Sequence, residues 1–221
     1  LAGACWWMKD YNPPVRARLD RVSVFFLTSY INSPWCGAPS AVLRGGLIPG
    51  SPDRFSRSSA RAIQDCPESI PISGCFPRHG YHTVSDGKVF HHIEDHADSW
   101  SEPPFRTHPD GYDVYWAEYN RWELWMNSES GRHINPRTMR GPFCEQAEVP
   151  DTAYDDGKLA LRAIRDLTRL KDCGKPFFLA CGFWKPHLPF NAPKKYWDLY
   201  PPGSISPAPD SLRPEGRPEQ V

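Results

Sequence analysis

The segment from residue 151 to 190 constrains the fold more than any other part of the chain. Residues 151–172 carry apolar side chains at helical spacing, and the seven residues Phe177–Phe183 are all apolar or Gly. Such a run is typical of a strand buried on both faces of a sheet. Gly174 ends the helical pattern and Pro176 opens the strand. A helix that turns directly into a buried strand predicts an α/β fold.

Two features predict how this helix begins and which side it buries. Thr152-Ala-Tyr-Asp155 matches a capping box, with Asp in place of the usual Glu or Gln at its fourth position. The predicted buried stripe consists of Leu159, Ala160, Ala163, Ile164, Leu167 and Leu170. A second, shorter strand is expected at 80–85, ending at Asp86-Gly87-Lys88.

The loop that follows the long strand carries a cation and an imidazole, in Trp184-Lys185-Pro186-His187. Ligands of open α/β sheets bind beyond the carboxyl ends of the strands. There, Lys185 would supply fixed positive charge for an anion, and His187 could pass a proton near neutral pH. The alternative is a surface loop with two solvated polar residues.

Two other places suggest chemistry, and each has a plainer interpretation. Cys36 lies in a turn rich in Pro and Ser, where it is either a nucleophile or a small half-buried hydrophobe. Residues 88–98 hold three His and three carboxylates, which form either a metal site or a hydrated loop. The seven Cys include no C-x-x-C pair, which argues against a zinc site or a disulfide scaffold.

Composition narrows the class of protein. Lys+Arg and Asp+Glu both number 26 in 221 residues, so no net charge favours nucleic acid as a partner, and no apolar run approaches the roughly 20 residues of a membrane span. The 25 Pro coexist with 9 Trp, 9 Tyr and 11 Phe, which predicts an ordered, loop-rich protein. Residues 201–221 are Pro-rich, which predicts a linker or a truncated continuation of the domain. The residues that follow Leu1 do not have the pattern of a signal peptide.

Several segments together resemble the sulfatases, and within them the iduronate-2-sulfatase-like branch. The most telling match is Pro176-Phe-Phe-Leu-Ala-Cys-Gly-Phe-Trp-Lys-Pro-His-Leu-Pro-Phe190. The others are Leu19–Val22, Ser33–Cys36, Gly80–His91, Asp98–Pro104, Val149–Lys158 and Pro193–Tyr196.

The resemblance implies an alkaline-phosphatase-like α/β fold, with a central, mostly parallel sheet flanked by helices, that hydrolyses sulfate esters of sugars or glycosaminoglycans. In that family a formylglycine-generating enzyme oxidises the motif Cys, here Cys36, to the nucleophile, which also binds a calcium ion. By the same match, Lys88 and His91 would contact the formylglycine and sulfate. His187 would face the leaving oxygen and Lys185 would line the substrate pocket. Such enzymes work in lysosomes, in the periplasm or outside the cell.

The chain also departs from the family pattern. Cys36-Gly-Ala-Pro-Ser-Ala41 has one residue too many between Cys and Pro, and Ala in place of Arg. The family's other metal ligands are expected outside the chain, so residues 1–200 would form a partial, incomplete catalytic domain with impaired activity. Gly74 and Pro77 oppose the helix that the family has at 69–77. A non-catalytic pseudo-sulfatase that binds sulfated glycans, and a phosphate or phosphonate ester hydrolase of the same superfamily, remain as alternatives.

Overall fold

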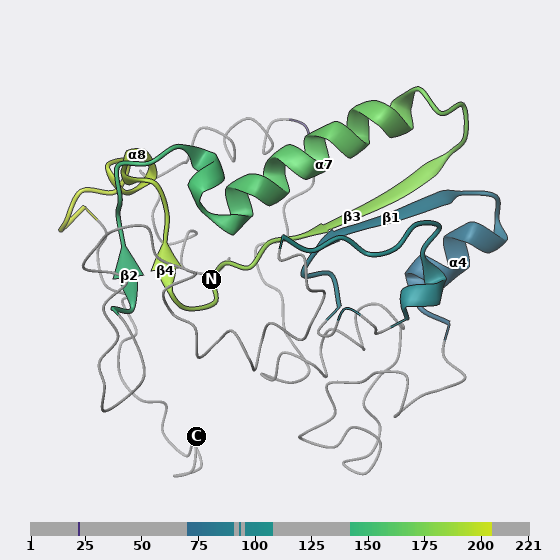
Figure 1. Ribbon diagram of the computed structural model, residues 1–221, viewed down its shortest axis with the longest axis horizontal. Helices are drawn as coiled ribbons and strands as arrows, with labels where there is room; N and C mark the ends of the chain where they lie inside the picture. Colours follow the sequence, from purple (N-terminus) through teal and green to yellow (C-terminus); the bar gives the residue numbers. More distant parts are fainter. Residues whose placement is uncertain (1–21, 23–69, 91–92, 94–95, 108–141, 205–221) are drawn as a thin grey trace, which may run out of the picture. The chain divides into compact units, whose positions relative to one another are not determined.

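The computed structural model describes residues 22, 70–90, 93, 96–107 and 142–204 (Figure 1). The chain divides into two compact units, Leu1–Tyr30 with Trp197–Val221, and Ile31–Tyr196. The described helices and strands belong to the second unit, apart from the last residue of the short helix α8 (Lys194–Trp197). None of the described helices is long and apolar enough to cross a membrane.

A pair of parallel strands organises the second unit. β1 (His82–Gly87) lies beside β3 (Phe177–Gly182), with His82 opposite Phe177 and Gly87 opposite Gly182. The helix α7 (Asp155–Lys171) precedes β3 and contacts both strands. Parallel strands with a helix packed on them are what the α/β prediction requires, so this part of the prediction is confirmed.

The two faces of the β1–β3 pair are covered by different elements (Figure 1). On one face, Arg162 of α7 lies 3.6 Å from the carboxylate of Asp86. On the other face, Phe178 stacks on Phe76 of α4 (Ile72–Arg78) with ring centroids 4.4 Å apart. Because side chains alternate along a strand, Asp86 and the register partner of Phe178, Thr83, point to opposite faces. The core cluster of Val89, Phe90 and Trp100 packs against Phe178 on the α4 side.

The remaining elements are short. The two-residue strands β2 (Cys144–Glu145) and β4 (Phe190–Asn191) form a second parallel pair. Two 3₁₀ turns, η1 (Ala97–Ser99) and η3 (Asp151–Ala153), precede Trp100 and α7 respectively. The loop 183–189, which follows β3, therefore ends at a strand that is paired with β2.

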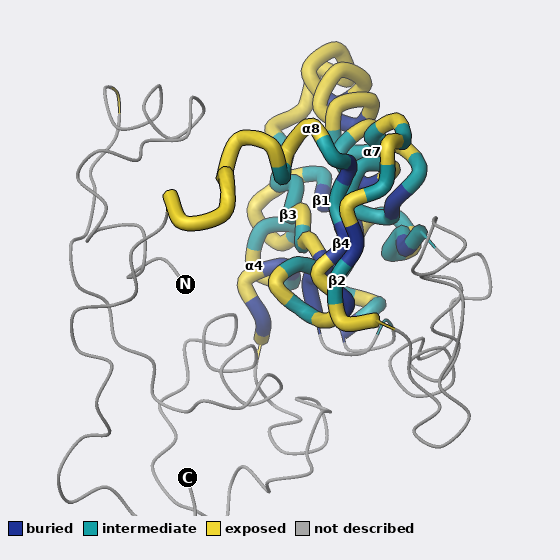
Figure 2. The backbone as a smooth tube through the Cα atoms, turned by 90° about the vertical axis from the view of Figure 1, so that its left-hand side faces the viewer, coloured by how far each residue is buried: buried dark blue, intermediate teal, exposed yellow. Residues whose placement is uncertain are grey.

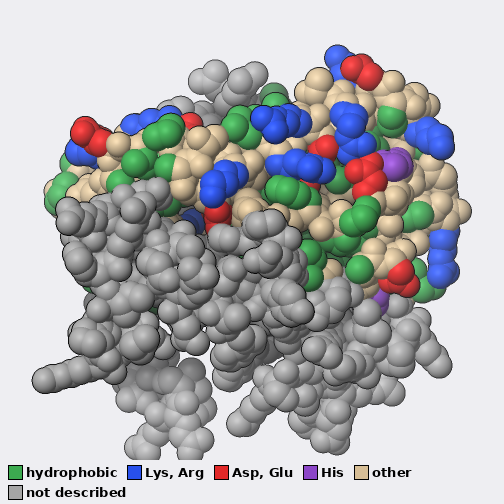
Figure 3. Space-filling view, viewed as in Figure 1, with side chains coloured by type: hydrophobic (Ala, Val, Ile, Leu, Met, Phe, Trp, Pro, Cys, Tyr) green, Lys and Arg blue, Asp and Glu red, His purple; other side chains and the backbone are tan. Residues whose placement is uncertain are grey.

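The predicted helix is present, but its start and its buried face differ from the prediction. Residues 151–153 form η3, α7 begins at Asp155, and no side chain caps the helix at Tyr154, so the capping box was wrong. Leu159 and Leu170 are buried as expected, whereas Ile164 and Leu167 are 58% and 46% exposed. The buried position between them belongs to Asp166, because arginines neutralise its charge there. Exposed residues accordingly run along much of α7 in Figure 2, and Figure 3 shows basic and acidic side chains interspersed over the same region.

Two other expectations were wrong. A helix does form at Ile72–Arg78 despite Gly74 and Pro77. Packing of Phe76 on Phe178 and Tyr81 outweighs the poor helix propensity of this short segment. β3 is half-buried instead of buried on both faces, and Cys181 near its end is exposed.

Candidate functional site

Three of the predicted site residues lie just beyond the carboxyl ends of β1 and β3. Lys88 follows Gly87, the last residue of β1, and the loop 183–189 follows Gly182, the last residue of β3. The main-chain N–H of Lys88 donates to the carbonyl of Gly182 at 2.7 Å, so the two exits are joined directly. The structure thus brings Lys88, Lys185 and His187 to one edge of the strand pair, as the strand positions predict.

The close approach of these two strand ends requires glycine. A Cβ on Gly182 would lie 2.0 Å from the carbonyl oxygen of Lys88, and one on Gly87 would lie 2.4 Å from that of Gly182. Gly87 also has a φ of +77°, which side-chain-bearing residues rarely adopt. The two glycines therefore let the main chains touch at the point where the site begins.

The ammonium group of Lys185 contacts the main chain of its own loop. Its Nζ donates to the carbonyl of Pro189 at 2.7 Å and to that of His187 at 3.4 Å. Burial lowers the pKa of Lys185 below its usual value, while the negative charges of Asp156 and Asp155 act in the opposite direction. The peptide bonds Lys185–Pro186 and Leu188–Pro189 are both cis.

One ring nitrogen of His187 is fixed by the same loop. Nδ1 lies 2.7 Å from the carbonyl oxygen of Trp184, and the main-chain N–H of His187 donates to that oxygen at 3.0 Å. Because a carbonyl oxygen can only accept, Nδ1 carries a hydrogen. Nε2 is then the ring nitrogen at which His187 can exchange a proton.

Asp156 joins the first turn of α7 to the start of this loop. Its Oδ1 accepts the N–H of Trp184 at 2.8 Å, and its Oδ2 accepts the N–H of Lys185 at 3.1 Å. A cavity of about 20 Å³, roughly the space of one water molecule, lies beside these contacts. Its lining comprises Ala153, Tyr154, Asp155, Asp156, Trp184, Lys185 and Asn191. The sequence prediction gave Asp156 no role of its own and missed this contact to the loop.

The other predicted site residues lie outside the described part of the chain. Cys36, His91 and most of the predicted His and carboxylate cluster at 88–98 cannot be placed. Within the residues that the structure describes, no three His, Cys, Asp or Glu side chains come together as a metal site would require. The nucleophile and metal predictions thus remain predictions.

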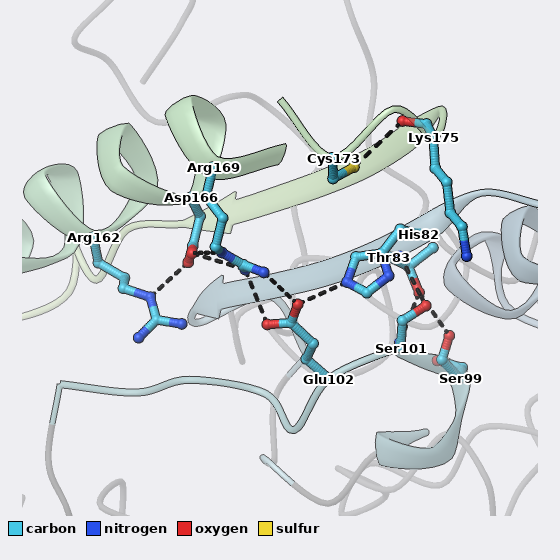
Figure 4. Close-up of polar contacts among 10 residues, drawn as sticks. All are labelled: His82, Thr83, Ser99, Ser101, Glu102, Arg162, Asp166, Arg169, Cys173 and Lys175. Carbon is cyan, nitrogen blue, oxygen red and sulfur yellow. Dashed lines mark hydrogen bonds and ion pairs between the residues drawn. The ribbon is translucent and has the colours of Figure 1, made fainter. Parts of the chain in front are cut away.

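A chain of ion pairs, which we call the ion-pair ladder, runs from α7 to the start of β1 (Figure 4). Arg162 donates to Asp166 at 2.5 Å, and Arg169 bridges Asp166 at 2.9 Å and Glu102 at 2.7 Å. Glu102 in turn accepts from Nε2 of His82 at 2.7 Å. The hydrogen bond from Arg169 is the main reason that the pKa of Glu102 is lowered. Burial raises the pKa of Asp166, but hydrogen bonds from both arginines outweigh it and leave that pKa below its usual value.

Asp86, beside the ladder, is a buried carboxyl that the sequence prediction overlooked. Its side chain is fully buried, and its oxygens have no hydrogen-bond partner among the described residues, with Nε of Arg162 at 3.6 Å. Burial, followed by repulsion from Asp166, raises its pKa to about 6, and attraction to Arg162 only partly opposes this shift. The signal was available in the sequence, because Asp86 continues the alternation His82, Val84, Asp86 that faces α7.

Comparison with known proteins shows what the chain resembles. The chain is 35% identical over 230 residues to iduronate 2-sulfatase of Homo sapiens and 30% identical over 220 residues to that of Mus musculus, each match covering 97% of the chain. A protein named sulfatase from Formosa agariphila is 29% identical over 202 residues, or 87% of the chain. No protein-family model matches the chain.

These matches cover nearly the whole chain but only part of the relatives. The chain spans 38% of the length of each of these three proteins. Within that span fall Lys88, Lys185 and His187, at the edge of the strand pair where an α/β enzyme binds its ligand. Over nearly its whole length, the chain is thus similar to proteins of the sulfatase family, iduronate 2-sulfatases among them.

Proposed function

We propose that this chain is part of a sulfuric ester hydrolase that cleaves sulfate esters of sugars or glycosaminoglycans. The observation that carries the proposal is the placement of Lys88 and His187 just beyond the carboxyl ends of two neighbouring parallel strands. The names of the relatives, sulfatase and iduronate 2-sulfatase, give the chemical class. Residues 1–200 would belong to a catalytic domain of the alkaline-phosphatase-like type, of which β1, β3 and α7 form one layer pair.

In this proposal each residue at the edge has one task. Lys88 places a positive charge against the sulfate oxygens, where negative charge shifts in the transition state. His187 gives the proton on Nε2 to the oxygen of the leaving alcohol, and the bond from Nδ1 to the carbonyl of Trp184 keeps its ring oriented. Lys185 lines the pocket next to it, and His91 would join Lys88 at the sulfate.

The family further implies a formylglycine at Cys36 and a divalent cation, usually calcium. Both would act at the nucleophile, and the formylglycine would require a formylglycine-generating enzyme as partner. The described residues offer no cluster of three metal ligands, so by themselves they do not fit a complete metal site. Cys36 itself, in the altered motif Cys36-Gly-Ala-Pro-Ser-Ala41, is the residue on which the proposed activity depends. As in other members of the family, a lysosomal, periplasmic or extracellular location is expected.

The role of His187 can be tested through the leaving group. Replacing His187 with Ala in the protein that carries this chain should lower kcat/KM about 100- to 10,000-fold for a sugar sulfate, whose alkoxide needs a proton. The loss should be much smaller for 4-nitrophenyl sulfate, because that leaving group departs without one. His79→Ala, at an exposed histidine that directly follows α4, is the matched control and should leave both rates unchanged. Equal losses on both substrates would contradict the assignment.

Mass spectrometry of the peptide around Cys36 tests the nucleophile. Formylglycine at Cys36 is the expected result, with turnover of aryl sulfate above that of aryl phosphate. An unmodified thiol, with binding of sulfated oligosaccharide but no turnover, would instead favour the glycan-binding alternative that the irregular motif suggests. Preference for aryl phosphate would favour the phosphate or phosphonate hydrolase.

A further inference from the structure

We propose that Asp156 is a positioning residue for His187, acting through the peptide group that joins Trp184 to Lys185. The proposal rests on the proposed role of His187 in proton transfer. In this arrangement, the carboxylate of Asp156, the peptide group and the imidazole of His187 are linked in series by hydrogen bonds. None of the sequence patterns pointed to this arrangement.

The series of hydrogen bonds passes through a single peptide group. Oδ2 of Asp156 accepts the N–H of Lys185 at 3.1 Å, and that N–H belongs to the same peptide group as the carbonyl of Trp184. The carbonyl in turn accepts from Nδ1 of His187 at 2.7 Å. A peptide group whose N–H donates to a carboxylate is polarised, so its carbonyl oxygen becomes a stronger acceptor. The charge of Asp156 thus favours the hydrogen on Nδ1 of His187.

A second contact fixes the orientation of that peptide group. Oδ1 of Asp156 accepts the N–H of Trp184 at 2.8 Å, so the two carboxylate oxygens hold two consecutive amides. Trp184 is almost fully buried, which limits the rotation of the peptide further. Only a side chain with two acceptor oxygens can hold both amides in this way, since Asn offers one acceptor and Ala none.

The position of Asp156 is itself set by close packing. The next residue, Gly157, lies so near η3 that a Cβ there would be 1.8 Å from the carbonyl oxygen of Asp151. The first turn of α7 is therefore pressed against the preceding segment, and the carboxylate of Asp156 cannot shift without moving it. Asp156 therefore links the first turn of α7 to the loop 183–189 and to the ring of His187.

The first test reads the ring of His187 directly and does not depend on activity. In ¹⁵N NMR spectra of the intact protein, His187 should show the hydrogen on Nδ1, and Asp156→Asn should give a mixture of the two neutral tautomers. Exchange of the Lys185 amide with solvent should be slow in the wild type and at least about tenfold faster in Asp156→Asn. Asp155→Asn, one residue earlier on α7, is the matched control and should change neither.

The second test asks whether the arrangement matters for the reaction. Asp156→Asn should lower kcat by up to about 100-fold with little change in KM, and more for sugar sulfates than for 4-nitrophenyl sulfate. Asp156→Glu, which keeps both acceptor oxygens, should lie between the wild type and Asp156→Asn. If Asp156 had a purely structural role, its replacement would lower kcat equally for both substrates. Asp156→Glu and Asp156→Asn would then give the same kcat.

The outcomes separate the two proposals. Unchanged tautomer and amide exchange in Asp156→Asn, or fast exchange of both amides in the wild type, would overturn the positioning role. The wild-type measurement holds even if the variants fail to fold. A changed tautomer in a protein that hydrolyses no sulfate ester would support the positioning role and count against the proposed function instead.

Discussion

Two regions beside the β1–β3 pair hold their charged side chains in different ways. Along α7, the ion-pair ladder joins charge to charge, from Arg162 through Arg169 and Glu102 to His82. At the carboxyl end, Lys185 and His187 donate to main-chain carbonyls, and the carboxylate of Asp156 accepts from main-chain amides. We call this second region the carboxyl-end site.

The two kinds of contact have different consequences for the stability of the fold and for the geometry of the loop. Ion pairs between partly exposed side chains add little free energy, because water screens them and the long side chains lose entropy. Contacts to the main chain fix the path of a loop, since each one orients a peptide group. Substitutions at Glu102 and His82, at the partly exposed end of the ladder, should therefore change the free energy of unfolding slightly, whereas substitutions at the carboxyl-end site should have larger and more local effects.

The largest effect is expected where the two strand ends touch. Gly182→Ala would place a Cβ 2.0 Å from the carbonyl oxygen of Lys88, so β1 and β3 must separate. We expect a loss of at least about 3 kcal/mol in the free energy of unfolding, measured by urea denaturation.

Gly174→Ala is the control for this substitution. Gly174 has a positive φ of +69°, but no atom lies within 4 Å of the position of its Cβ. Backbone strain alone should cost about 1 kcal/mol there. Equal losses in the two variants would mean that the contact between the strand ends is not what holds the carboxyl-end site together.

Asp86, buried between the two regions, should make stability depend on pH. Burial raises its pKa to about 6, from an ordinary value near 3.8. The folded state therefore binds more protons than the unfolded chain between these values, and the contribution of Asp86 to stability is full below pH 4 and lost as the pH rises through 6. The difference between these two pKa values corresponds to about 3 kcal/mol. Asp86→Asn should be as stable as the wild type near pH 4 and more stable at pH 7.

Thermal unfolding from pH 4 to pH 7 measures this difference. Asp98→Asn, at an exposed position, is the control and should follow the wild type throughout. A wild type that gains stability relative to Asp86→Asn as the pH rises would show that Arg162 outweighs the burial of Asp86. The ladder would then extend into the core, and the comparison between the two regions would weaken.

The sequence could predict what depends on local patterns. The run Phe177–Phe183 and the apolar spacing before it gave the helix, the strand and the edge at which Lys185 and His187 lie. The predicted capping box was wrong because a 3₁₀ turn at Asp151–Ala153 precedes α7. The expectation that Gly74 and Pro77 oppose a helix was wrong because Phe76 packs on Phe178. The contacts of Asp156 with the loop and of Arg169 with Glu102 could not be predicted, because the partners lie 28 and 67 residues apart along the chain.

The smallest effect, and the sharpest test of the comparison, concerns the pair of Arg169 and Glu102. The guanidinium of Arg169 makes two hydrogen bonds to the carboxylate, at 2.7 and 3.0 Å, yet its side chain is 47% exposed. A double-mutant cycle of Arg169→Ala and Glu102→Ala should give a coupling of only about 0.5–1 kcal/mol, reduced further in 0.5 M NaCl. Because Arg169 lowers the pKa of Glu102, this coupling is present above the unfolded pKa of Glu102 and is lost as the pH falls. A coupling above about 2 kcal/mol that persists in salt would mean that the ladder acts as a buried network. The ladder would then contribute to stability as much as the carboxyl-end site, and the contrast between the two regions would not hold.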